Sequence, residues 1–132
     1  QNLVQRCLAD NVKFFEIRAP SVLQLDEVQI GEGAILSPFV TLTSNIRIGK
    51  HFHANLYSYV EHDCVIGDYF SAMPGSIVSG DVRIDDLVYL GTNSSIKEKL
   101  TIHSLTTIGL NTGIVKNITE PGIYVGQNIR KI

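Results

Sequence analysis

The fold is decided by the stretch from Ile30 to Ile114, which carries an aliphatic residue at every sixth position. The series reads Ile30, Leu36, Leu42, Ile48, Ala54, Val60, Ile66, Ala72, Val78, Ile84, Leu90, Ile96, Ile102, Ile108 and Ile114. A second column, two residues earlier, runs from Val28 to Thr112, is mostly small or apolar, and carries no charge. A spacing of two puts both columns on one face of a strand, whereas steps of six would wander round a helix. The stretch is therefore predicted to be repeated short β-strands.

A longer period of 18 residues is superimposed on the hexads. Gly31, Gly49 and Gly67 are 18 residues apart, and so are Gly91 and Gly109. Three hexads therefore form one coil, and we predict an all-β, three-sided prism of parallel strands with about five coils. We expect these glycines to lie at corners and to adopt backbone angles that a side chain would forbid.

Composition excludes several classes of function. The chain has 132 residues and a formal net charge of −2 without a basic stripe, so we expect no nucleic-acid partner. It contains no apolar run of membrane-spanning length and no secretory signal, so we expect no membrane association. Cys7 and Cys64 are interpreted as free thiols, Cys64 being packed inside, which favours a reducing cytoplasm.

Three segments are expected. Residues 1–20 combine a short helix over Asn2–Asp10 with a strand over Val12–Arg18. They have two interpretations: the remnant of an upstream α/β domain that is missing here, or a simple cap on the first coil. Residues 21–119 form the β-helix, and residues 120–132 form a closing strand, at Ile123–Gly126, and a tail.

His62 is the most informative candidate for chemistry. It falls at a corner, should face outward, and is flanked by Glu61 and Asp63. The residues one coil before and after it are Ser44 and Gly80, which leave space beside the ring. A neutral imidazole can accept a proton near neutral pH, and a neighbouring carboxylate raises its basicity and fixes its tautomer.

The motif from Glu61 to Gly67 carries a family resemblance. It is similar to the Glu-His-Glu/Asp-Cys-x-Ile-Gly motif of the hexapeptide-repeat acyltransferases that include the sialic-acid O-acetyltransferase-like and nucleotide-amino-sugar N-acetyltransferases. The likeness continues through Gly80, Leu90–Ser94 and Tyr124–Gly126. The resemblance implies a left-handed β-helix, acetyl-CoA as co-substrate, a sugar or nucleotide-sugar acceptor, and a homotrimer with each site between two neighbours.

The resemblance also implies roles for the residues around the histidine. His62 would be the general base that takes a proton from an acceptor amine or hydroxyl as it attacks the thioester. Asp63 would raise the basicity of His62. Glu61 and Asn55 match positions that help to place the acceptor and the histidine.

Four further positions would bind the cofactor if the resemblance holds. The backbone N–H of Gly80 would hold the developing oxyanion. Thr92 and Leu110 sit where the main chain of the family holds the pantetheine arm. Ser71 falls where a histidine of the family touches the cofactor, which is a departure from the family pattern.

Other interpretations stay open. A zinc site would need three histidines at a subunit boundary; His51 and His53 could chelate, but the family spacing for such a site is absent, and we expect no metal. The acceptor could be a non-nucleotide one, such as sialic acid or a serine hydroxyl, or the chain could be a non-catalytic scaffold. Exposed apolar side chains are expected around the histidine, either as an interface or pocket wall or as scattered surface aromatics of the ordinary kind. These are Leu56, Tyr57, Tyr59 and Tyr69.

Overall fold

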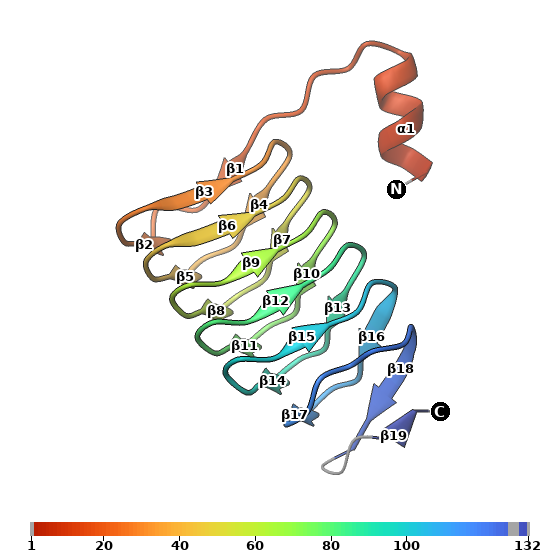
Figure 1. Cartoon of the computed structure of the whole chain (residues 1–132). Coiled ribbons are helices and arrows are strands. Elements are labelled where there is room, and N and C mark those ends of the chain that lie inside the picture. The colour runs from red at the N-terminus through yellow and green to blue at the C-terminus, as the bar shows by residue number, and fades with distance from the viewer. Residues whose placement is uncertain (1, 127–129, 132) are drawn as a thin grey trace.

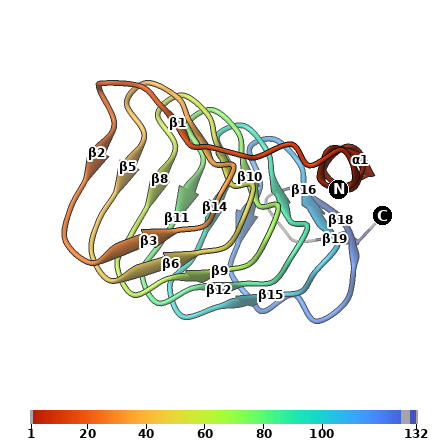
Figure 2. The ribbon, with the colours of Figure 1, turned by 90° about the horizontal axis from the view of Figure 1, so that it is seen from above.

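The computed structural model of the chain is a three-sided prism of short parallel strands, and it describes residues 2–126 and the backbone of residues 130–131 (Figures 1 and 2). Sheet A contains β1 (Ile17–Arg18), β4 (Ile35–Leu36), β7 (His53–Ala54), β10 (Ser71–Ala72), β13 (Tyr89–Leu90), β16 (Thr106–Ile108), β18 (Gly122–Val125) and the antiparallel β19 (Arg130–Lys131). Sheet B contains β2 (Leu23–Gln24), β5 (Thr41–Leu42), β8 (Tyr59–Val60), β11 (Ile77–Val78), β14 (Ser95–Ile96) and β17 (Gly113–Ile114). Sheet C contains β3 (Val28–Ile30), β6 (Ile46–Ile48), β9 (Val65–Ile66), β12 (Arg83–Ile84) and β15 (Thr101–Ile102).

The register confirms that three hexads form one coil. Ile48 lies beside Ile66, Val60 beside Val78, and Ala72 beside Leu90, each pair 18 residues apart on neighbouring strands. Sheet B contains six strands, so the prism has about six coils and the estimate of five was low. The difference arises at the start, where β1 and β2 already stack on β4 and β5.

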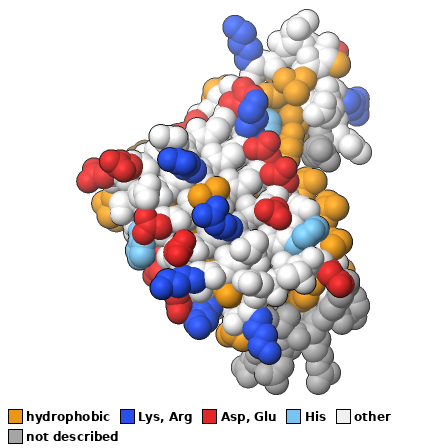
Figure 3. All heavy atoms as spheres, in the orientation of Figure 1, with side chains coloured by type: hydrophobic (Ala, Val, Ile, Leu, Met, Phe, Trp, Pro, Cys, Tyr) orange, Lys and Arg blue, Asp and Glu red, His pale blue; other side chains and the backbone are white. Residues whose placement is uncertain are grey.

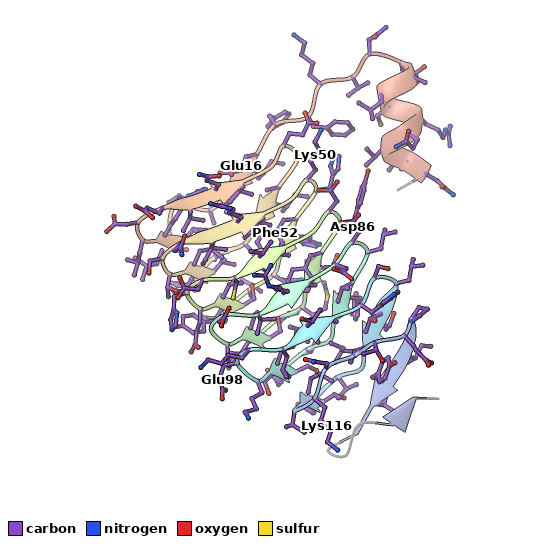
Figure 4. All side chains as sticks on the ribbon, in the orientation of Figure 1. Glu16, Lys50, Phe52, Asp86, Glu98 and Lys116 are labelled. Carbon is purple, nitrogen blue, oxygen red and sulfur yellow. The ribbon has the colours of Figure 1, made fainter. Side chains whose placement is uncertain are left out.

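The two columns of the repeat form the core. Phe52, labelled in Figure 4, and Phe70 stack inside it with ring centroids 5.7 Å apart, and both are fully buried. Ser94 and Thr112, polar members of the second column, are buried and hydrogen-bonded, whereas the buried Ser76 hydroxyl has no partner among the described residues. The interior is therefore filled by side chains, and chemistry must take place on the outside.

The corners contain residues with a positive φ, but these are not the glycines that the sequence analysis expected. Every sixth residue from Glu27 to Asn111 has a positive φ, between 52° and 62° for the non-glycine residues among them. The five glycines expected to need such angles do not have them. At Gly31, a Cβ atom would instead lie 2.7 Å from the carbonyl carbon of Gly49 in the next coil. The glycine spacing of 18 thus reflects close approach of neighbouring coils, which excludes a side chain.

The N-terminal segment leaves the prism. The helix α1 covers Asn2–Ala9 and has no buried residue, and Figure 1 shows it standing away from the coils. Of the strand expected over Val12–Arg18, only β1 (Ile17–Arg18) is present. Phe14 contacts the ring of His51 edge-on, with centroids 4.7 Å apart, and this contact ties the segment to the prism.

The face seen in Figure 3 carries side chains of both charges. Acidic and basic side chains are interspersed over sheet C there. Within residues 2–126 and 130–131, no helix has the length and apolarity that a bilayer span requires.

Candidate active site at the corner between sheets B and C

Each corner of the prism has two residues, and the N–H of the first, where that residue is not a proline, is left out of the backbone hydrogen bonds between coils. At the corner between sheets B and C (the B–C corner), the first residues are Asp26, Ser44, His62, Gly80 and Glu98; Glu98 is labelled in Figure 4. The second residue donates to the preceding coil, as Asp81 N–H does to the His62 carbonyl over 2.9 Å. Among the described residues, no backbone acceptor takes the N–H of these first residues. Corners therefore offer donors outside the coil-to-coil ladder, although side-chain oxygens accept the N–H groups of Lys50, Leu56, Asp68 and Gly80.

His62 faces outward at the B–C corner, as predicted. Its Nδ1 lies 2.8 Å from Oδ2 of Asp63, and its side chain is 59% exposed. With a proton on Nδ1 donated to that carboxylate, the Nε2 lone pair is free to act as a base. Asp63 is the second residue of this turn and has a φ of 61°.

Asn45 completes this pair, and the sequence interpretation missed it. Its Nδ2 donates to Oδ1 of Asp63 over 2.6 Å from the preceding coil. The hydrogen bonds from His62 and then Asn45 hold the pKa of the Asp63 carboxyl below its usual value, so it stays ionised at neutral pH. The missed signal was the spacing of 18 between Asn45 and Asp63, which stacks them.

Gly80 lies directly against the imidazole. A Cβ atom at this position would lie 2.7 Å from Cε1 and 2.9 Å from Nε2 of His62. The ring therefore occupies the space that any side chain here would need. This placement agrees with the expected proximity of residues 62 and 80, and it sets the Gly80 backbone beside Nε2.

The Gly80 N–H already has a partner, which the sequence did not predict. It donates to Oε2 of Glu61 over 2.8 Å. Glu61 is half-buried and precedes His62, and its carboxylate reaches one coil further along the prism. The donor expected to bind an oxyanion is thus held by an anionic oxygen of the chain.

Asn55 lies away from His62, at the end of β7. Its Oδ1 accepts the N–H of Leu56 over 2.8 Å, and its carbonyl accepts the Ser58 hydroxyl over 2.7 Å. Asn55 therefore orders the corner between sheets A and B (the A–B corner), where the chain turns from β7 into β8.

The expected cofactor residues other than Gly80 also lie away from His62. Thr92 and Leu110 are first residues of the A–B corner, one above the other, and in the described chain their N–H groups donate to no protein atom. Ser71 lies on β10 between His53 and Tyr89 of the neighbouring strands. A six-residue side of the prism, about 20 Å of extended chain, separates the A–B from the B–C corner. One chain does not bring these groups together.

The aromatic residues expected around His62 are distributed over other corners. Tyr57 stacks on Phe39 at the A–B corner, with centroids 5.0 Å apart. Tyr69 stacks on His51 at the corner between sheets C and A, at 5.0 Å. Tyr59 lies on β8, the strand that leads into the histidine corner. The expectation of an aromatic cluster at His62 was therefore wrong. Residues stack at one corner when their numbers differ by a multiple of 18, and Tyr57 and Tyr69 do not have that separation from His62.

Surface hollows and metal ligands do not add to the site. Two shallow grooves run over sheet C, and none of the predicted site residues lines them. In the part of the chain that the structure describes, no three His, Cys, Asp or Glu side chains gather in a metal-binding arrangement. His51 instead packs between Phe14 and Tyr69.

Comparisons with known proteins give both sequence and structural relatives. No family model matches the sequence. Over 64 residues the chain is 47% identical to GDP-perosamine N-acetyltransferase from Escherichia coli O157:H7, which covers 48% of this chain and 29% of that enzyme. The structure matches WeeI from Acinetobacter baumannii AYE with a TM-score of 0.95 and 41% identity, covering 99% of this chain and 64% of WeeI.

A third match shares the fold at lower identity. PerB from Caulobacter crescentus, solved in complex with CoA and GDP-perosamine, matches with a TM-score of 0.95 at 22% identity, covering 100% of this chain and 64% of PerB. The chain thus spans between 29% and 64% of the length of these three proteins.

Proposed function

We propose that this chain, a hexapeptide-repeat β-helix related to the nucleotide-sugar N-acetyltransferases, transfers an acetyl group from acetyl-CoA to the amine of a nucleotide-linked sugar. The observation that carries the proposal is the B–C corner, where a histidine–aspartate pair lies against a glycine whose N–H is not used by the coil. The names of the E. coli relative and of PerB, with its CoA and GDP-perosamine, support the choice of donor and acceptor.

In the proposed reaction, His62 acts as the general base. The acceptor nitrogen attacks the thioester carbonyl carbon and forms the C–N bond, while His62 Nε2 takes the proton from the nitrogen. Asp63 stabilises the imidazolium through Nδ1. The C–S bond then breaks, and the imidazolium returns the proton to the CoA thiolate. The Gly80 N–H stabilises the negative charge on the carbonyl oxygen between these two events.

A second copy of the chain completes the site in this proposal. The Thr92 and Leu110 donors belong to the A–B corner, about 20 Å of extended chain away from the His62 corner. A closed ring of three prisms would set the A–B corner of one copy against the B–C corner of the next, so that each site uses two copies. We therefore propose a homotrimer, with Asn55 and Ser71 contributing from the side of the A–B corner.

Two further proposals concern the surroundings of the enzyme. Leu3 and Leu8 of α1 are exposed, so we propose that residues 1–20 pack on an α/β segment that helps to bind the acceptor. Both cysteines are free, which agrees with a reducing cytoplasm as the place of the reaction.

The experiment is turnover with acetyl-CoA and a panel of amino sugars. Thiol release is followed with GDP-perosamine, other nucleotide amino sugars, sialic acid and serine, and we expect nucleotide amino sugars to be the best acceptors. His62→Ala should abolish release, whereas the matched change His103→Ala, at another corner, should not. A scaffold protein would show neither turnover nor a rise in melting temperature with CoA. Full activity of His62→Ala would refute the mechanism.

A further inference from the structure

The contact between Glu61 and Gly80 has no counterpart elsewhere at this corner. The first-residue N–H groups of Ser44, His62 and Glu98 donate to no protein atom in the described chain, whereas the Gly80 N–H donates to Glu61 Oε2. The neighbouring N–H groups of Ser79 and Asp81 already form coil-to-coil hydrogen bonds. The prism therefore closes without the Glu61 contact, and this hydrogen bond is not needed for the fold.

The bound carboxylate oxygen resembles the group that the site is proposed to stabilise. An oxyanion and a carboxylate oxygen both carry negative charge and both accept a short hydrogen bond from a backbone N–H. Oε2 of Glu61 lies 2.8 Å from the Gly80 nitrogen, and the His62 ring lies against the same glycine. A thioester carbonyl oxygen that accepts a linear hydrogen bond from the Gly80 N–H would have to take the place of Glu61 Oε2.

We propose that Glu61 is a specificity-determining residue: its carboxylate competes with the acetyl carbonyl oxygen for the Gly80 N–H. This inference rests on the proposed function. Acetyl-CoA binds only by displacing the carboxylate, whereas CoA, which lacks the carbonyl, leaves it in place. Glu61 therefore weakens the preference of the protein for acetyl-CoA over CoA.

The displaced carboxylate has a defined place to go. Glu61 is on the outer face of the chain immediately before His62, and its own N–H is held by the Val78 carbonyl, so only its side chain moves. Free of Gly80, the carboxylate can accept a hydrogen bond from an N–H of the acceptor amine. When the acetyl group has left, the Glu61 carboxylate can return to the Gly80 N–H.

The test compares two ligands on four proteins. The ligands are CoA and an acetyl-CoA analogue in which a methylene group replaces the thioester sulfur, so that the carbonyl stays and transfer is blocked. The proteins are the wild type, Glu61→Ala, Glu61→Gln and the control Asp81→Asn, which changes a carboxylate at the same corner that does not contact the Gly80 N–H. Titration calorimetry gives both dissociation constants for each protein.

Glu61→Ala should raise the ratio of the CoA to the analogue dissociation constant about tenfold, the scale of one hydrogen bond to a charged group. Glu61→Gln keeps the shape but loses the charge, so its ratio should fall between wild type and alanine and provides the test if alanine misfolds. Asp81→Asn should match wild type. An unchanged or lower ratio in both Glu61 variants overturns the competition while leaving the proposed function intact. Binding of neither ligand by wild type overturns both.

Discussion

Gly80→Ala tests the geometry of the site with a single methyl group. The new Cβ would lie 2.7 Å from Cε1 and 2.9 Å from Nε2 of His62. Both distances are well below the roughly 3.5–4.0 Å at which non-bonded heavy atoms normally make contact. The obstacle is the end of a rotatable side chain that is 59% exposed, and Gly80 does not adopt a left-handed backbone. The ring should therefore move by about 1 Å while the coils stay as they are.

The two consequences have very different sizes. A displacement of about 1 Å costs on the order of 100-fold in rate, and loss of a general base costs about 10²–10⁴-fold. We therefore expect kcat to fall by at least about 100-fold in Gly80→Ala. The free energy of unfolding should change by no more than about 0.5 kcal/mol, because the strain is relieved at the surface.

Thiol release and urea unfolding measure these two effects, with two glycine controls. Gly113→Ala should leave both unchanged, because nothing lies within 4 Å of its Cβ position. Gly31→Ala should be destabilised, because its Cβ would lie 2.7 Å from the backbone carbon of Gly49. The reasoning would be refuted by a Gly80→Ala protein with kcat within threefold of wild type (roughly 0.7 kcal/mol in barrier). Destabilisation as large as in Gly31→Ala would refute it equally.

Three other changes probe the positioning of the base and the core. Asn45→Ala should let the pKa of the Asp63 carboxyl rise toward its ordinary value. A lowered pKa contributes stability that is lost as the pH falls through it, so the stability of the variant should depend less steeply on pH in acid. An NMR titration of the carboxyl groups that finds no rise in the Asp63 pKa would contradict the contact. Burial raises the pKa of the Cys64 thiol to about 11, so a thiol reagent at pH 8 should label Cys7 alone. Rapid labelling of two thiols per native chain would contradict the packing of Cys64. Phe52→Ala should lower the free energy of unfolding by about 3–5 kcal/mol in urea titrations, and a loss below about 1 kcal/mol would show that the core is not close-packed there.

The sequence was sufficient to predict the prism because its core repeats strictly. A shift of one residue would turn Val60 and Ile66 outward and expose an aliphatic row, so the hexad spacing sets which residues face in. The 18-residue spacing then sets which residues stack, and it correctly placed Gly80 next to His62. The same arithmetic, applied to every residue, would also have found Asn45 under Asp63 and would have moved Tyr57 and Tyr69 to other corners.

What the sequence did not contain is the direction in which a side chain reaches and the use of each backbone donor. The contact from Glu61 to Gly80 spans 19 residues rather than 18, so it runs diagonally between coils and follows no repeat. The role of the recurrent glycines was misassigned for a related reason. The spacing shows that glycine recurs but does not show why, because a positive φ and a crowded Cβ position both select glycine. The structure distinguishes these two causes: Gly31 lacks a positive φ, and a Cβ there would lie too close to Gly49 in the next coil.

The location of the proposed chemistry follows from how a prism uses its hydrogen bonds. Along the strands inside the stack, N–H groups donate to a neighbouring coil, as Glu61 N–H does to the Val78 carbonyl, so the middle of a flat side offers no donor for a ligand. At Gly80, Thr92 and Leu110 the first corner residue leaves its N–H outside the ladder. Polar ligands should therefore bind along edges, and two edges of one prism are separated by a whole side, about 20 Å of extended chain. A ligand as long as CoA can use donors on two edges only where two prisms meet, which is why this fold favours sites shared between copies.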